Sequence, residues 1–163
     1  MKNKVGVYVK KKVMFVSSSG GHLSELLRLE PLFNDYDYIL VTEKTNSTLK
    51  LKNKYNIKYV AYGSRRYIFK YVFVFTYNVF KFIYFMIKYR PKTIVTTGAH
   101  TGGIACVIGK LFKAKIIYIE SLAKVKTLSL TGKNVYKIAD KFYVQWKDLL
   151  KFYPKAEYIG RLM

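Results

Sequence analysis

Apolar and polar residues alternate along the chain in blocks that predict strands and helices in turn. Short, uninterrupted apolar runs such as residues 116–119 are typical of strands in a parallel sheet that is covered on both faces. Longer blocks repeat apolar residues at helical spacing, as Leu23, Leu26 and Leu27 do. The pattern predicts strands over residues 13–17, 38–42, 57–61, 93–97, 116–120 and 141–144. It predicts helices over residues 22–33, 47–55, 67–89, 102–112, 132–139 and 146–152.

Strands that alternate with helices indicate a doubly wound α/β domain with a mostly parallel, Rossmann-like sheet. The chain has 163 residues, which is enough for one compact domain with its own core. No internal repeat, low-complexity tail or Pro/Ser-rich linker divides the sequence. We therefore expect a single domain over residues 1–163.

Residues 67–89 are the most unusual block, because they hold 11 of the 28 aromatic residues. At about 100° per residue, Lys70, Lys81 and Lys88 fall on one line of a helix. Apolar side chains fill the opposite arc, so the block predicts an amphipathic helix with a basic, tyrosine-edged face. The residues expected to associate with a membrane are Arg65, Arg66, Lys70, Phe75, Lys81 and Lys88.

Three placements of the 67–89 helix are compatible with its sequence. The helix can lie in a membrane interface, with lysines reaching anionic headgroups and aromatic rings at headgroup level. It can be a core helix whose apolar face packs on the sheet. It can also cross the bilayer, for which its length is nearly sufficient. Three lysines on one face argue against lipid on all sides, so we favour the interfacial placement.

The formal net charge of +21 implies an anionic partner, which could be nucleic acid, an acidic membrane surface or phosphate groups. Lysine outnumbers arginine 25 to 5, a bias to which an AT-rich genome contributes. Such a bias does not explain why residues 44–119 hold 15 lysines and arginines and no acidic residue. No recognised RNA or DNA motif is present, so we expect no nucleic-acid partner.

The remaining composition limits the chemistry. A single cysteine, Cys106, excludes a disulfide framework, and two histidines are too few for an ordinary His/Cys zinc site. We therefore expect no metal. No secretory signal, Walker A lysine motif or Gly-x-Ser-x-Gly elbow is visible.

The first loop with candidate chemistry is Ser19-Gly20-Gly21-His22, between a predicted strand and a predicted helix. Glycines at such a turn let the backbone approach a ligand, and the N-terminus of a helix favours an anion, usually a phosphate. Histidine can act as a general base near neutral pH, so His22 is a candidate for that role. The alternative is an ordinary tight turn in which His22 only begins the helix.

A second loop of the same design carries Gly98, His100, Thr101, Gly102 and Gly103. Both loops follow predicted strands, and ligands of open α/β sheets bind outside the carboxyl ends of the strands. We expect this loop to contribute to the same site as the first. The alternative is that its glycines only allow a helix to pack closely on the sheet.

A third candidate is Glu120, which ends an apolar strand and precedes Ser121. A carboxylate in that position is expected to face solvent or to accept a hydrogen bond from a loop N–H. It could orient a sugar hydroxyl, or it could pair with His22 or His100.

Several blocks, in order, resemble one family. They are SGGHLSEL at residues 19–26, TGAHTG at 97–102, ESLAKV at 120–125, LSLTGK at 128–133, VQW at 144–146 and YIGRL at 158–162. Together they resemble the membrane-associated subunit of the two-part GlcNAc transferase of asparagine-linked glycosylation, whose bacterial relatives serve capsular and exopolysaccharide synthesis. The resemblance extends more distantly to the lipid-linked GlcNAc transferase of peptidoglycan synthesis, in which a Gly-Gly-His loop faces the acceptor.

The resemblance implies that this chain is the N-terminal half of a GT-B glycosyltransferase. A separate catalytic subunit would supply the other half and bind the UDP-sugar, so no cofactor is expected on this chain. The acceptor would be a polyprenyl-diphosphate-linked sugar, with UDP-galactose as the donor suggested by bacterial relatives. The residues implied to hold the acceptor or its phosphates are Ser19, Gly20, Gly21, Gly98, His100, Thr101, Gly102 and Gly103.

The expected reaction is an inverting transfer, in which His22 is the first candidate base and Glu120 the second. Eukaryotic members of the family carry an N-terminal membrane anchor, whereas here the first predicted strand begins almost at once. We therefore expect attachment to the cytoplasmic face of the membrane through residues 67–89. The alternative function is a non-catalytic subunit that recruits the catalytic partner to the membrane, and a more distant one is a basic nucleic-acid-binding protein.

Overall fold

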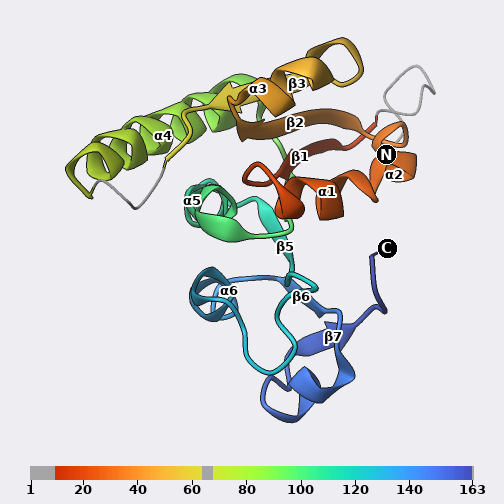
Figure 1. Cartoon of the computed structure of the whole chain (residues 1–163). Coiled ribbons are helices and arrows are strands. Elements are labelled where there is room, and N and C mark those ends of the chain that lie inside the picture. Colours follow the sequence, from red (N-terminus) through yellow and green to blue (C-terminus); the bar gives the residue numbers. More distant parts are fainter. Residues whose placement is uncertain (1–9, 64–67, 163) are drawn as a thin grey trace.

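A single parallel sheet organises the chain, whose computed structural model describes residues 10–63 and 68–162. Within that range, seven strands follow the order β3-β2-β1-β4-β5-β6-β7, and all neighbours run parallel (Figure 1). The order reverses between β1 and β4, so the switch point of this doubly wound sheet lies between these two strands. The expected fold class is confirmed.

The elements have the following bounds. The strands are β1 (Lys12–Val16), β2 (Asp37–Glu43), β3 (Ile57–Val60), β4 (Thr93–Thr96), β5 (Lys115–Ile119), β6 (Lys141–Val144) and β7 (Ala156–Tyr158). The α-helices are α1 (Gly21–Leu27), α2 (Glu30–Phe33), α3 (Asn46–Leu49), α4 (Ile68–Tyr89), α5 (Ala99–Leu111) and α6 (Leu130–Val135). The 3₁₀ helices are η1 (Lys50–Asn53) and η2 (Lys147–Lys151).

All six expected strands are confirmed, whereas several expected helices differ. The continuous helix over residues 22–33 is wrong, because α1 ends at Leu27 and α2 begins separately. Pro31 lies in the first turn of α2, where its missing N–H leaves no helical hydrogen bond unmade. Residues 46–53 form a short helix followed by a 3₁₀ turn, and residues 147–151 form only a 3₁₀ turn. Strand β7 was not predicted.

Helices cover both faces of the sheet. Alternate strand residues point to opposite faces, and apolar side chains on each face need a cover. Met14 and Val16 belong to the core under α4, α5 and α6. Val13 and Phe15 point the other way and pack with Leu26 of α1 and with α2. In Figure 1 these two groups of helices lie on opposite sides of the strands. The carboxyl ends of the strands therefore stay free of helices and carry the loops.

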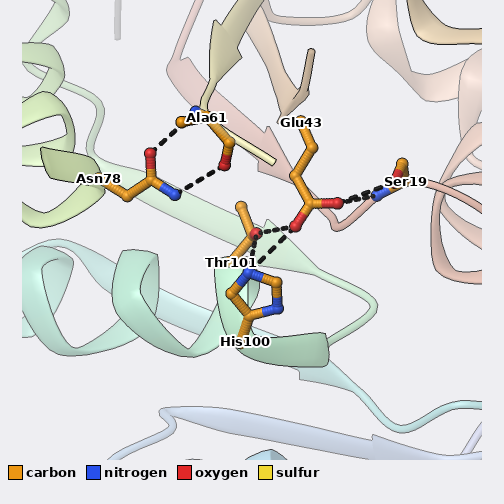
Figure 2. A network of polar contacts seen from close by, with 6 residues as sticks. All are labelled: Ser19, Glu43, Ala61, Asn78, His100 and Thr101. Atoms are coloured by element: carbon orange, nitrogen blue, oxygen red, sulfur yellow. Dashed lines mark hydrogen bonds and ion pairs between the residues drawn. The ribbon is translucent and has the colours of Figure 1, made fainter. Parts of the chain in front are cut away.

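Helix α4 packs on the sheet through an arc that contains one polar side chain. Phe82, Phe85 and Asn78 are buried on this arc. The Asn78 side-chain amide donates to the Ala61 carbonyl at 2.9 Å, and its oxygen accepts from the Ala61 N–H at 2.9 Å (Figure 2). These bonds tie α4 to the chain that leaves β3.

The opposite arc of α4 is apolar and exposed. Phe69, Phe73 and Phe80 are 86%, 77% and 67% exposed, although they lie on a helix that packs on a core. The predicted division of this helix into one basic and one apolar face is therefore wrong. A buried arc and an exposed apolar arc lie on opposite sides of α4. Lysines and tyrosines separate them on one flank, where Lys81 lies over the Tyr84 ring.

Candidate functional site

The loops after β1, β2 and β4 meet at the switch point of the sheet. Residues 19–22 follow β1, Glu43 is the last residue of β2, and residues 97–101 follow β4. Because β1 lies between β2 and β4, the three carboxyl ends are neighbours. The loops after β1 and β4 are thus brought together, and Glu43 joins them.

The Gly20-Gly21 turn is open to solvent. Gly20 has a φ of 84°, a left-handed conformation that favours glycine. A Cβ built on Gly20 or Gly21 would meet no other atom within 4 Å. The hydroxyl of the preceding Ser18 is buried and has no hydrogen-bond partner among the described residues. The turn therefore lies next to open space, and its role in ligand binding stays a prediction.

His22 is held in one tautomer by the loop after β4. Its Nδ1 lies 2.9 Å from the Thr97 carbonyl oxygen, and the Thr97 hydroxyl donates to the His22 carbonyl at 2.6 Å. Since a carbonyl oxygen only accepts, the hydrogen bond assigns the proton to Nδ1 and leaves the lone pair of the neutral ring on Nε2. This arrangement suits a general base, and the role of His22 stays a prediction.

Glu43 is the site residue that the sequence reasoning missed. It is 2% exposed, and one carboxylate oxygen accepts from the Ser19 N–H at 3.1 Å and the Ser19 hydroxyl at 2.8 Å. The other accepts from the Thr101 hydroxyl at 2.9 Å and lies 3.1 Å from His100 Nε2 (Figure 2). Glu43 therefore links the loops after β1 and β4. An acidic residue at the end of an apolar strand was the signal that could have identified it.

The network keeps Glu43 ionised. Burial on its own raises the pKa of a carboxyl group, because it removes water from the charged form. Here the hydrogen bonds from His100, Ser19 and Thr101 outweigh burial, and the pKa of Glu43 lies below its usual value. A buried negative charge thus lies next to the His100 ring.

The glycines of the second loop serve packing. A Cβ on Gly98 would lie 2.5 Å from the Tyr118 hydroxyl oxygen, and one on Gly102 would lie 2.3 Å from Thr96 Oγ1. Gly102 and Gly103 lie within α5, which begins three residues earlier than predicted. The geometry therefore favours the packing alternative for Gly98 and Gly102, whereas Gly20 and Gly21 of the first loop lie next to open space.

Glu120 is buried, and it interacts with its own loop and, electrostatically, with His22. The expectation that it faces solvent is wrong, because it is 1% exposed. It accepts hydrogen bonds from the N–H groups of Ser121 and Ser129, which confirms the alternative of a loop N–H partner. Burial raises the pKa of Glu120, and these hydrogen bonds oppose the increase only in part. Glu25 of α1 accepts from the Ser121 hydroxyl and the Leu122 N–H. The loop after β5 is therefore held both by Glu120 and by Glu25. This geometry favours a positioning role for Glu120.

The residues expected to associate with a membrane lie on or near α4. Arg65 and Arg66 fall outside the described residues, and so does the Lys70 side chain. Lys88 donates to the Tyr84 hydroxyl at 2.9 Å and, like Lys81, lies beside the exposed apolar arc. Phe75 is partly exposed and lines a cavity. By length and composition, residues Tyr71–Tyr89 could cross a membrane, and no other helix in residues 10–63 and 68–162 could.

The parallel sheet, with its switch point between β1 and β4 and helices on both faces, defines a Rossmann-like domain. MurG from Acinetobacter baumannii superposes with a TM-score of 0.70 and 15% identity, over 85% of this chain and 42% of that one. UDP-N-acetylglucosamine 2-epimerase from Rickettsia bellii gives a TM-score of 0.73 and 15% identity, over 94% and 46%. The chain spans less than half of either protein, and at these identities the likeness shows the fold alone.

The chain belongs to the family described as "Oligosaccharide biosynthesis protein Alg14 like", whose model matches residues 13–162. It is 32% identical to the "UDP-N-acetylglucosamine transferase subunit ALG14" of Kluyveromyces lactis, over 99% of this chain and 83% of the relative. The protein of the same name from Homo sapiens is 27% identical, over 93% and 82%. The expected family is confirmed, and these relatives do not bear on the capsular or exopolysaccharide branch.

Proposed function

We propose that this chain is the membrane-associated subunit of a two-component glycosyltransferase, and that it holds the catalytic partner at a membrane that contains the lipid-linked acceptor. The single observation that carries the proposal is the exposed apolar arc of α4, opposite the arc that packs on the sheet. The family and the fold support a transferase subunit. Recruitment of the catalytic partner to the membrane, which the sequence analysis gave as the alternative, is thus the principal function that we propose.

The physical case for membrane association rests on the chemistry around this arc. A contiguous exposed apolar surface on a soluble domain usually marks an interaction site. Phe73 and Phe80 would enter the boundary between headgroups and acyl chains, with burial worth about 25 cal/mol per Å² of apolar surface. Lys81 and Lys88 on the flank would reach anionic headgroups. A net charge of +21 adds attraction to the acidic cytoplasmic face of the membrane.

The partner would supply the second half of the enzyme. This chain matches less than half of the full-length enzymes that share its fold. Because the relatives are named as one subunit of a transferase, a separate catalytic subunit would bind the UDP-sugar, and this chain would bind no cofactor. The names of the relatives make UDP-N-acetylglucosamine the first donor to test. The capsular setting and UDP-galactose rest on the sequence resemblance alone.

Vesicle flotation tests the membrane role. Replacing Phe73 and Phe80 together by Asp should lower binding to anionic vesicles at least tenfold. Two negatively charged side chains would replace two aromatic rings that enter the membrane in the proposed complex. Phe152→Asp is the control, since Phe152 is 70% exposed and lies directly after η2, outside α4. If the double variant and the control bind vesicles equally, the membrane role of α4 is refuted.

A second candidate function is a direct catalytic contribution by His22, which the open Gly20-Gly21 turn and the fixed tautomer favour. Transfer from UDP-sugars to a lipid-linked acceptor should be measured with this chain, the partner and both together. His22→Ala should then abolish transfer by the pair without dissociating it. Unchanged turnover would remove His22 from the mechanism and leave recruitment as the function.

A further inference from the structure

Glu25 of α1 lies three residues after His22, so both side chains leave the same turn of that helix. One carboxylate oxygen of Glu25, Oε1, accepts from the Ser121 hydroxyl at 2.9 Å and from the Leu122 N–H at 3.1 Å. Both donors belong to the loop that follows β5. Glu25 therefore joins the helix that carries the candidate base to a loop that is distant in the sequence.

The loop after β5 depends on side-chain contacts for its position. Residues 120–129 form neither a strand nor a helix. The Leu122 carbonyl accepts from Trp146 Nε1 at 2.7 Å, and the Ser129 N–H donates to Glu120 at 3.0 Å. Since no ladder of backbone hydrogen bonds runs through this segment, each side-chain contact has a large share in holding it. Loss of the Glu25 bonds should therefore displace the loop.

The same loop holds Glu120 near His22. The Ser121 N–H donates to Glu120 Oε1 at 2.9 Å, so the residue that Glu25 holds in turn holds the Glu120 carboxyl. Burial has the largest effect on the pKa of Glu120 and raises it, and an electrostatic interaction with His22 is among the effects that oppose the increase. Because Glu25 and His22 share α1, the path from Glu25 through the loop to Glu120 returns to His22.

We propose that Glu25 is a positioning residue for sugar transfer, which acts through Ser121 on the Glu120 carboxyl beside the His22 base. The inference rests on the catalytic role of His22 proposed above. In that reaction the acceptor hydroxyl oxygen bonds to the anomeric carbon, its proton passes to His22 Nε2, and the bond to UDP breaks with its electron pair on the leaving phosphate oxygen. A carboxylate near a histidine base stabilises the positive charge that the ring gains. The position of Glu120 should therefore affect turnover.

Glu25 needs only one of its two oxygens for this role. Oε1 accepts both hydrogen bonds, whereas Oε2 is buried and has no hydrogen-bond partner among the described residues. The carbonyl oxygen of glutamine can accept the same two bonds, and alanine removes both. Glu25→Gln should therefore keep the loop in place, and Glu25→Ala should release it.

Transfer by the purified complex with the catalytic subunit tests the proposal, with UDP-N-acetylglucosamine as the donor and farnesyl-diphosphate-linked N-acetylglucosamine as the acceptor probe. Glu25→Ala should lower kcat at least tenfold and leave the KM of the donor within about twofold, because the loop acts on the base and not on donor binding. Glu25→Gln should restore kcat to within about threefold of the wild type. A glutamine variant as slow as the alanine variant would refute the role.

Glu30→Ala is the matched control on the neighbouring helix α2. Glu30 also accepts two hydrogen bonds, from Lys54 at 2.9 Å and from the Tyr55 hydroxyl at 2.7 Å, but neither involves the loop after β5. Its replacement should leave kcat close to the wild-type value. If Glu25→Ala and Glu30→Ala have the same kcat, Glu25 does not position the site.

Trp146 reports the loop directly, because it is the only tryptophan of the chain and donates to the Leu122 carbonyl. The fluorescence emission maximum of the purified chain should shift in Glu25→Ala. It should stay at the wild-type position in Glu25→Gln and Glu30→Ala. An unshifted emission in Glu25→Ala would show that the loop does not depend on Glu25, and it would overturn the inference without any transfer assay.

Ser121→Ala is a milder variant that tests the same path should Glu25→Ala fail to fold. It removes one of the two bonds to Glu25 and should lower kcat about threefold. Combined with Glu25→Ala it should cause no further loss, and additive losses would contradict a shared path. Transfer that survives His22→Ala would refute the catalytic role of His22 and this inference with it. Transfer that is lost in His22→Ala but normal in Glu25→Ala would refute this inference alone.

Discussion

Glu43→Gln is the sharpest test of the network at the switch point. The substitution preserves the side-chain volume but replaces one carboxylate oxygen by an NH₂ group, which cannot accept a hydrogen bond. In the wild type, both oxygens accept, one from Ser19 and the other from Thr101 and His100. At least one buried donor would therefore lose its acceptor, and the charge that faces His100 would disappear.

The magnitude follows from the number and kind of bonds lost. A hydrogen bond to a charged group contributes about 1.5–3 kcal/mol, and a buried donor that is left without its acceptor costs about 1–3 kcal/mol. Because Gln also avoids burying a charge, part of this loss is offset. We expect the free energy of unfolding to fall by about 2–3 kcal/mol, which lowers the melting midpoint by about 4–12 °C in a domain of this size.

Urea and thermal unfolding at pH 7 measure the effect, with Glu157→Gln as the control. Glu157 is half exposed and pairs with Lys141 on the surface, where water screens the pair, so the control should change little. Because the folded protein holds the pKa of Glu43 below its usual value, its stabilising contribution is present above the ordinary carboxyl range. That contribution is lost as pH falls through the lowered pKa. The difference between wild type and variant should therefore shrink on acidification, and equal stability at pH 7 would refute the reasoning.

Three further predictions follow from buried contacts. Gly102→Ala should lower the free energy of unfolding by about 1–3 kcal/mol, because its Cβ would lie 2.3 Å from Thr96 Oγ1. The methyl group added by Gly21→Ala meets open space, so this control should leave the free energy of unfolding nearly unchanged. Equal melting midpoints for the Gly102→Ala and Gly21→Ala variants would contradict the packing argument. Burial raises the pKa of Glu120, so the folded state keeps a proton that the unfolded chain has lost, and stability falls as pH rises through this window. Glu120→Gln should reduce that fall in urea titrations from pH 4 to 7, and an unchanged slope would show that Glu120 does not cause it. Burial also raises the pKa of the Cys106 thiol, so a thiol reagent should label it only under unfolding conditions, and rapid labelling of the folded chain would contradict its burial.

Much of the fold follows from local patterns. The six longer strands could be predicted from continuous apolar runs. Strands that are covered on both faces carry apolar residues at successive positions, without alternating polar residues. The break between α1 and α2 could also have been predicted, since Pro31 favours the start of a new helix. Strand β7 was missed because three residues after a 3₁₀ turn carry too little pattern, and only pairing with β6 defines it.

The site shows a different limit. The sequence places His22 and His100 at strand ends, but it does not show that Glu43 lies between their loops. That position depends on β1 pairing with both β2 and β4, which no local pattern encodes. Likewise, helical periodicity shows where apolar side chains recur along α4, but not which arc meets the sheet.

The pair of hydrogen bonds between Asn78 and Ala61 determines how α4 is rotated about its own axis. Either apolar arc of this helix could cover a sheet. Turning the arc of Phe69 and Phe80 inward would leave the Ala61 N–H and carbonyl without their partner, at about 1–3 kcal/mol for each group that stayed buried. The hydrogen bonds of the Asn78 side-chain amide thus favour the rotation of α4 that leaves Phe69 and Phe80 exposed. Asn78→Leu should keep the helix and loosen that selection, so the surface that we propose to bind lipid depends on a polar residue on the opposite side of the helix.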